Sequence, residues 1–340
     1  MAARSRVLRV GGMLAGLVAL PLVPGLAFTV MGLQGASTVW TLGPITGLLA
    51  VLAVGLRTAL GVAVATSVLT VAAVAASGTP WAAALVMLVA AGATGLTSVR
   101  GLSGSLVMAP ITVAYVLADP PAVLPDRPPL EGAAVTGGAM LLAIVWGAAL
   151  ARAAGSRVHL PTATPVPPRV AVGYAVVLGL ALGAAAAVAS ALTLRHGGAW
   201  LMLTLLVVLQ PHLDDAWSRV LQRVAGTLAG FGIALVLGLT VPWPGVAYVV
   251  GGACLVGALS LRVIHRPYWQ YVTLLTPAVV LMDGAGTSVV ATDVTRLTFT
   301  LIGAGSALVV MAVLLPLRAR LNAPSPPDPP APTKIPASHQ

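Results

Sequence analysis

The stretch Val10–Met31, VGGMLAGLVALPLVPGLAFTVM, contains no charged residue and follows a basic segment with Arg4, Arg6 and Arg9. It is longer than the 7–15 residues of a secretory signal's apolar core, and it lacks the small-residue cleavage site of such a signal. About 20 apolar residues suffice for a helix to cross the hydrocarbon layer of a bilayer. We therefore expect this stretch to be a transmembrane helix.

Similar apolar runs, separated by Gly, Pro or charged residues, continue along the chain. Apolar residues make up 58% of the 340 residues, charged residues make up 8%, and the mean hydropathy is +1.00. Soluble domains carry about 25% charged residues, so this composition cannot cover a water-soluble surface. The sequence predicts an all-α integral membrane protein of about twelve transmembrane helices. The spans are expected near residues 10–31, 39–56, 58–76, 81–98, 102–118, 133–151, 170–193, 197–210, 220–240, 244–261, 268–283 and 294–317.

Basic residues are distributed unevenly between the two sides of these spans. Short loops that carry Lys and Arg remain in the cytoplasm. With the N-terminus on that side, all of the 18 Lys and Arg residues except Arg127, Arg195 and Arg296 are cytoplasmic. We expect a multi-pass protein of the plasma (inner) membrane with both termini in the cytoplasm. The net charge of +10 is spread singly between apolar runs, which disfavours a nucleic-acid partner.

An internal repeat relates two sets of six spans at an offset of about 165 residues. Because six is an even number, both halves would enter the bilayer in the same direction, which is the parallel repeat of some secondary transporters. The aligned pairs include Arg57 with Arg223, Pro110 with Pro277, and Asp119 with Asp283. The predicted domains are a first six-helix half (1–151), a cytoplasmic linker (152–169), a second six-helix half (170–321) and a disordered proline-rich cytoplasmic tail (322–340).

Short or interrupted helices at equivalent places in the two halves are candidates for a substrate site, because freed backbone groups must face protein or a cavity. The fifth and eleventh spans are expected to carry a proline in mid-membrane with threonines beside it, and the second and eighth spans form another pair. An ordinary proline kink is an alternative explanation. The candidates are Pro110, Thr112, Thr273, Thr276 and Pro277 in the first pair, and Gly43, Pro44, Gly47 and Pro211 in the second.

Ionisable residues at the ends of spans are further candidates, because exposing them to hydrocarbon is costly. Asp119 and Asp283 end the fifth and eleventh spans on the outer side, where they would either take up a coupling proton or lie at the interface. Arg57 and Arg223 open the third and ninth spans at the cytoplasmic face. Attraction of an anionic substrate and positive-inside anchoring both agree with that position.

Other polar patterns have simpler explanations. Asp215 and Arg219 are four residues apart, which favours a salt bridge at the start of a helix. Gly226 and Gly230 have the small-xxx-small spacing of closely packed helices. The sequence has no Walker A motif, no metal-ligand pattern, and a single cysteine, Cys254. We expect no enzyme activity, no cofactor and no metal site.

The segment Trp200–Gly230 reads WLMLTLLVVLQPHLDDAWSRVLQRVAGTLAG. It resembles the signature of the fusaric acid resistance and aromatic acid exporter (FUSC) family, with Leu-Thr after the Trp, then Gln-Pro, then Arg-x-x-Gly-Thr-x-x-Gly. The resemblance implies two six-helix membrane halves and proton-driven efflux of small aromatic or other organic acids. Larger members insert a sizeable cytoplasmic domain between the halves, so this chain resembles a compact form. The matching positions are Trp200, Thr204, Gln210, Pro211, Arg219, Arg223, Gly226, Thr227 and Gly230.

Two hypotheses for the function follow. The first is a secondary transporter that exports small organic acids, including aromatic ones, across the plasma membrane with proton coupling. Its partners would be the lipid bilayer, a small organic anion and protons. The alternative is a non-transporting membrane scaffold or assembly factor, for which the packing face at Gly226 and Gly230 and the tail 322–340 would matter more. Whether the protein is a monomer or a homo-oligomer stays open.

Overall fold

The computed structural model describes residues 16, 19–121, 123, 128–153, 163–210, 216–240, 243–264, 266–283 and 289–321, with the backbone alone for 216–217, 263, 283, 289–293 and 314–321. These residues form helices joined by short turns, and no strand occurs among them. The helices are an apolar helix Ala19–Val30, α2 (Gln34–Ala76), α3 (Pro80–Leu96), the 3-10 helix η1 (Thr97–Arg100), α4 (Met108–Ala118), α5 (Pro129–Ala153), α6 (Pro168–Ala191), α7 (His196–Val208), α8 (Ala216–Thr240), α9 (Pro244–Val263), α10 (Tyr268–Asp283) and α11 (Val289–Leu321).

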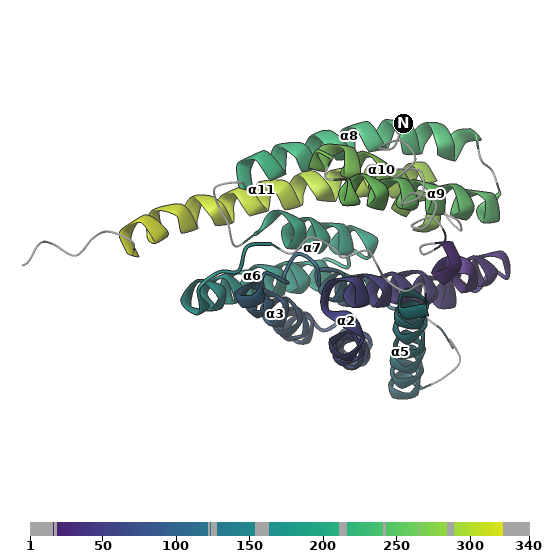
Figure 1. The fold of residues 1–340 in the computed structure, drawn as a ribbon, viewed down its shortest axis with the longest axis horizontal. Helices are drawn as coiled ribbons and strands as arrows, with labels where there is room; N and C mark the ends of the chain where they lie inside the picture. Colours follow the sequence, from purple (N-terminus) through teal and green to yellow (C-terminus); the bar gives the residue numbers. More distant parts are fainter. Residues whose placement is uncertain are drawn as a thin grey trace, which may run out of the picture.

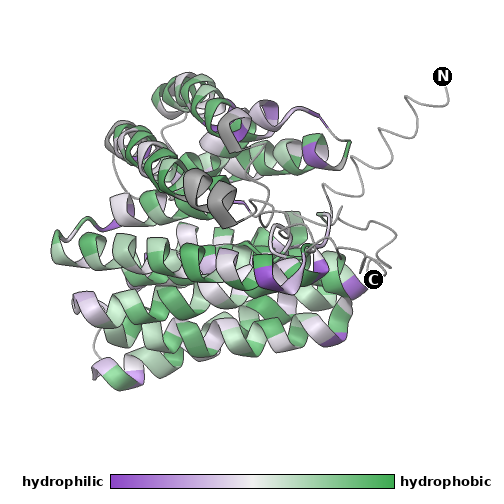
Figure 2. Cartoon of the chain, turned by 90° about the vertical axis from the view of Figure 1, so that its left-hand side faces the viewer, coloured by the Kyte–Doolittle hydropathy of each residue, from purple (hydrophilic) through white to green (hydrophobic). Residues whose placement is uncertain are grey.

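Among the described residues, seven helices are long and apolar enough to cross a membrane. Ala19–Val30, α4 and α7 are also apolar but shorter. Figure 2 shows hydrophobic residues along the lengths of the helices and hydrophilic residues mainly near their ends. Helices that are apolar on all sides need either a protein core or hydrocarbon on every face. The chain is a helical multi-pass membrane protein, as the composition predicts.

The long helix α2 is interrupted at Gly55, where φ is 75° and ψ is 168°. Residues with a side chain rarely adopt a positive φ, whereas glycine does so at little cost. The two parts of α2 coincide with the predicted spans 39–56 and 58–76. The interruption therefore lies close to the turn that the sequence places at Arg57, two residues before it.

Several helices begin at a proline. Pro80, Pro168 and Pro244 begin α3, α6 and α9. Proline suits the first helical position because the missing N–H has no intrahelical acceptor there. The linker expected at 152–169 is bounded by the end of α5 and the start of α6, and residues 154–162 lie outside the described residues, as does the expected tail 322–340.

The fifth predicted span, 102–118, is shorter in the structure than the sequence indicates. Helix α4 starts at Met108, and residues 101–107 form turns instead. Gly101 has a φ of 69°, and the glycine and serines that follow it favour turns. Pro110 therefore lies in the first turn of α4, where it does not interrupt the helix, and its position in mid-membrane stays a prediction.

The helices form two groups. Figure 1 shows α8, α9, α10 and α11 on one side of the molecule, α2, α3, α5 and α6 on the other, and α7 between them. Small residues bring helices close together within each group. A Cβ atom on Gly230 of α8 would lie 2.5 Å from Cβ of Thr276 on α10, and one on Gly226 would lie 2.7 Å from Cβ of Val272. The small-xxx-small pair of α8 is thus the contact with α10.

Segments far apart in the sequence connect the two groups. The helix Ala19–Val30 packs against α9, and the hydroxyl groups of Thr41 and Tyr248 lie 2.7 Å apart. The backbone N–H of Ala163 donates to the carbonyl oxygen of Gly101 at 3.0 Å. This last hydrogen bond ties the residues before α6 to the turn after η1.

Candidate functional site

A cavity of about 570 Å³ lies between the two helix groups and is lined by residues of α2, α4, α7, α8, α9 and α10. The wall formed by α2 extends from Gln34 to Leu52. Most of the lining side chains are aliphatic or aromatic. Polar groups are supplied by the start of α2, through Ser37, Thr38 and Thr41, and by arginines.

Four of the lining residues are arginines, which we call the arginine cluster: Arg219, Arg223, Arg262 and Arg266. Helix α8 supplies the first two, α9 supplies the third, and the last lies in the turn before α10. No carboxylate lines the cavity in the described part of the chain. Low-dielectric walls around charges of one sign concentrate the electric field, so the cavity attracts anions.

Arg223 is the most deeply buried member of the arginine cluster, with 1% of its surface exposed. Its Nη1 atom donates a hydrogen bond to the hydroxyl of Tyr268 at 3.4 Å. Its Nε and Nη2 atoms have no hydrogen-bond partner among the described residues. A buried guanidinium without a counter-charge is energetically costly, and such residues in membrane proteins commonly mark functional sites.

Aromatic rings form part of the cavity wall. The rings of Tyr268 and Tyr271 have centroids 5.9 Å apart, and Cζ of Arg262 lies 5.6 Å from the centroid of Tyr271. Tyr115 and Trp200 meet edge to face, with centroids 6.2 Å apart. Aromatic walls favour a ligand that contains a ring, because ring pairs gain energy beyond the burial of apolar area.

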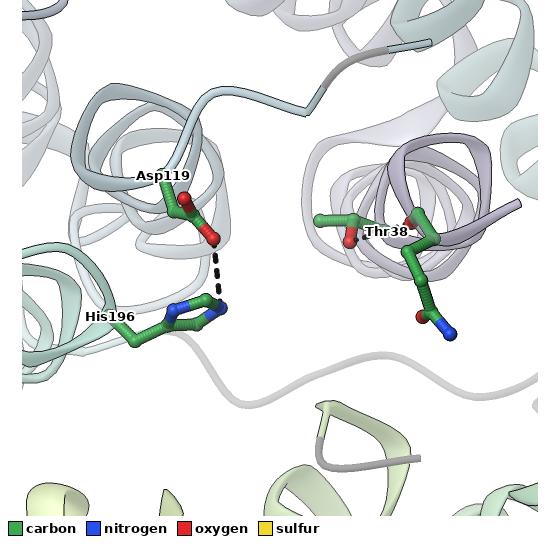
Figure 3. A network of polar contacts seen from close by, with 4 residues as sticks. Thr38, Asp119 and His196 are labelled. Atoms are coloured by element: carbon green, nitrogen blue, oxygen red, sulfur yellow. Dashed lines mark hydrogen bonds and ion pairs between the residues drawn. The ribbon is translucent and has the colours of Figure 1, made fainter. Parts of the chain in front are cut away.

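A second polar network lies beside Tyr115 and Trp200. His196 Nε2 and Asp119 Oδ2 are 3.0 Å apart, and both side chains are 39% exposed. Figure 3 shows this pair in one view with Thr38 of α2. The ring of His196 also meets that of Tyr115 edge to face at 5.8 Å. The pair therefore joins the end of α4 to the start of α7.

Arg296, which the sequence places at the outer end of the last span, is buried in the protein. It lies in α11, is 1% exposed, and its Cζ atom is 4.3 Å from the centroid of Trp200. It donates hydrogen bonds to the carbonyl and hydroxyl oxygens of Thr276 at 3.3 and 3.4 Å. The stacking and hydrogen bonds explain why this arginine can be buried within α11.

The structure brings some of the predicted site residues to the cavity and places others elsewhere. Those that line it are Trp200, Gln210, Arg219 and Arg223. Asp119 pairs with His196 at the end of α4. Pro211 and Asp215 lie outside the described residues, as does the side chain of Asp283.

The remaining predicted residues lie outside the cavity lining. Arg57 is exposed, and Pro110, Thr227 and Pro277 are buried. Thr112 and Thr46 share a hydrogen bond of 2.9 Å, and Thr204 lies against Gly303 of α11. Thr273 and Thr276 lie on the α10 face that contacts Gly230 of α8, whereas Tyr268, Tyr271 and Leu275 lie on the cavity face.

The segment 261–271, LRVIHRPYWQY, supplies two arginines and two tyrosines of the cavity lining that the sequence reasoning missed. Arg262 and Arg266 were interpreted there as markers of a cytoplasmic loop only. The missed signal is the closeness of these two arginines to Tyr268 and Tyr271, which follow them in the sequence, since cationic and aromatic side chains together favour an anionic ring.

Comparison with protein families matches residues 180–310, from α6 into α11, with a family described as fusaric acid resistance protein-like. Residues 180–310, which we call the FUSC segment, are thus similar to this family. The resemblance inferred from Trp200–Gly230 is confirmed over this part of the chain, which is less than half of its length. The FUSC segment contains the whole arginine cluster and Trp200, whose indole ring lines the cavity.

One curated relative is an uncharacterized protein of Neisseria gonorrhoeae, 32% identical over 146 residues, which are 42% of this chain and 34% of the relative. The chain thus spans about a third of that relative's length. No solved structure matches this chain significantly. Among the features of the site, those on α7 to α10 belong to the FUSC segment, and the α2 and α4 walls come from the half that precedes it.

Proposed function

We propose that this protein is a secondary transporter that exports small organic anions, including aromatic acids, across the plasma membrane. The observation that supports this proposal best is the cavity, whose walls are apolar and aromatic and whose charged lining groups, among the described residues, are all cationic. An ionised aromatic acid has an apolar ring and a negative group that complement these two features. A non-transporting scaffold would have no use for such a cavity.

The size of the cavity agrees with this substrate class. Pockets for small molecules usually have volumes of about 300–1,000 Å³, and this cavity has about 570 Å³. Its length also fits passage across a bilayer. The lining along α2 from Gln34 to Leu52 corresponds to about 27 Å of helix at 1.5 Å per residue, close to the ~30 Å thickness of the hydrocarbon layer.

We propose further that twelve membrane helices in a parallel 6+6 repeat form this path. In such a repeat the fourth span corresponds to the tenth and the seventh corresponds to the first. The fourth span contacts the seventh, and the tenth contacts the first. In one pair Gly95 of α3 lies against Ala175 of α6, and in the other Gly25 lies against Tyr248 of α9. The contact between the first part of α2 and α5 has an equivalent between α7 and α11. These exchanged contacts support a pseudo-two-fold arrangement.

Proton coupling and cytoplasmic termini complete the proposed mechanism. In that topology the start of α2 faces outward, and the arginine cluster lies toward the cytoplasm, where it would collect anions for export. The Asp119–His196 pair is the group that we propose exchanges the coupling proton, because an acid and a base lie 3.0 Å apart there and both side chains reach solvent.

The experiment is counterflow of radiolabelled benzoate in proteoliposomes at pH 8, where the acid is ionised. The wild type is expected to exchange label, and Arg223→Gln is expected to lose at least about 30-fold, because truncating one partner of a buried charge pair costs 2–5 kcal/mol. The matched control is Arg57→Gln, which removes the same charge from an exposed position outside the cavity. Absence of counterflow for a panel of organic acids would overturn the proposal and favour a scaffold.

A further inference from the structure

We propose that the arginine cluster binds two negative groups at once, so that the preferred substrate is an organic dicarboxylate with a small apolar body. This inference rests on the proposed transport function and names the substrate class. It is carried by the free edge of one buried arginine, by a second cation held at a defined place, and by the absence of carboxylates from the described lining.

The first anionic group has a defined binding place at Arg223. The two nitrogens without a partner, Nε and Nη2, lie on the same edge of the guanidinium group, and Nη1 on the other side is used by Tyr268. A carboxylate takes this kind of edge with two parallel N–H···O hydrogen bonds. Both nitrogens are closed to water in this structure, so a carboxylate reaches this edge when a neighbouring side chain moves aside, and it then replaces no bound water.

The second anionic group has its place at Arg262. Tyr268, which contacts Arg223, packs against Tyr271, and Tyr271 in turn lies beneath Arg262. The cavity wall thus contains a continuous series of cation, ring, ring and cation. Because both guanidinium groups are held by this tyrosine pair, a ligand with an acidic group at each end can meet both of them across its ring.

Charge balance favours a dianion over a monoanion. A single carboxylate at Arg223 would leave three guanidinium groups of the cluster without an opposite charge among the described lining residues. Asp214 and Asp215 lie outside the described residues. Like charges near the protein surface repel each other substantially at short range. A second carboxylate relieves this repulsion, whereas a neutral group in the same place does not.

The test compares benzene-1,3-dicarboxylate with 3-carbamoylbenzoate, which has the same ring and nearly the same size but one negative charge fewer. Dissociation constants are measured by titration calorimetry on the full chain in uncharged detergent, so that neither transport nor lipid is needed. The dicarboxylate is expected to bind at least about tenfold more tightly, which corresponds to 1.4 kcal/mol. In Arg262→Gln the ratio of the two constants is expected to fall to about one, whereas Arg57→Gln keeps it.

The proposal is overturned if the two compounds bind equally to the wild type, or if the tenfold ratio survives in Arg262→Gln. It is also overturned if only added phosphatidylglycerol binds, since the cluster would then serve a lipid headgroup. Counterflow in phosphatidylcholine vesicles distinguishes failure of the proposed substrate class from failure of the proposed transport function. Exchange of benzoate without preference for the dicarboxylate refutes the substrate class alone, and tight dicarboxylate binding without any exchange refutes transport alone.

Discussion

Replacing Arg223 by methionine should have opposite effects on the free and the ligand-bound protein. The side chain is 1% exposed, and the hydrogen bond that it makes within the described residues is long, 3.4 Å to Tyr268. Desolvation of a buried ion costs several kcal/mol, and replacing buried ionic groups by hydrophobic residues of similar volume often stabilises a protein by about 1–4 kcal/mol. We expect Arg223→Met to stabilise the ligand-free protein by about 1–3 kcal/mol.

The bound state should show the reverse order. A ligand at 100 times its dissociation constant stabilises the wild type by about 2.7 kcal/mol, and Arg223→Met should gain almost none of this. The assay is thermal unfolding of the purified protein in detergent, followed by tryptophan fluorescence, with and without benzene-1,3-dicarboxylate. The control, Arg57→Met, removes an equal charge from an exposed site and should stay within about 0.5 kcal/mol in both conditions.

One result would refute this reasoning directly. If Arg223→Met unfolds more easily than the wild type without ligand, its charge is compensated inside the folded protein. The guanidinium would then be part of the structure rather than a vacant anion site. If the ligand stabilises Arg223→Met as much as the wild type, the anion binds elsewhere, and Arg223 is again not the anion site.

Three further outcomes are expected. Gly230→Ala should destabilise the protein by about 1–3 kcal/mol in the unfolding assay because its Cβ would meet α10, whereas Gly232→Ala, with nothing within 4 Å, should not. His196→Gln should cost at most about 1 kcal/mol, because its half-exposed pairing with Asp119 is solvent-screened, yet it should abolish the dependence of counterflow on a pH gradient. Arg296→Lys should lower the melting temperature, because an ammonium group cannot stack flat on the indole beneath it.

Much of the helical framework was predictable from the sequence, because hydrocarbon excludes charge and exposed backbone alike. The break in α2 illustrates this, since Gly55 lies two residues before Arg57 and the two features together indicate a turn. The prolines that begin α3, α6 and α9 likewise indicate helix boundaries in the sequence. The count of twelve membrane spans and the internal repeat stay predictions, because seven helices meet the length and hydropathy of a span in the described chain.

The cavity was less predictable, because a helix surrounded by lipid and protein is apolar on both faces. On α10 the sequence indicates Thr273 and Thr276 as site residues, but they contact α8 and α11, whereas Tyr268 and Tyr271 face the cavity. No periodic pattern distinguishes those two faces. Arg262 was misjudged for a related reason, since an arginine at a helix end serves topology and anion binding equally well. Only the contacts between distant helices separate the two roles.

The contact between Thr41 and Tyr248 has a consequence for biogenesis. The two residues are 207 positions apart in the chain. At synthesis rates of about 5–20 residues per second, α2 leaves the ribosome roughly 10–40 s before its partner on α9 exists. During that interval the hydroxyl groups at the start of α2 must remain hydrated or bind a transient helper. Slowed translation ahead of α9 should therefore increase degradation of the nascent N-terminal helices.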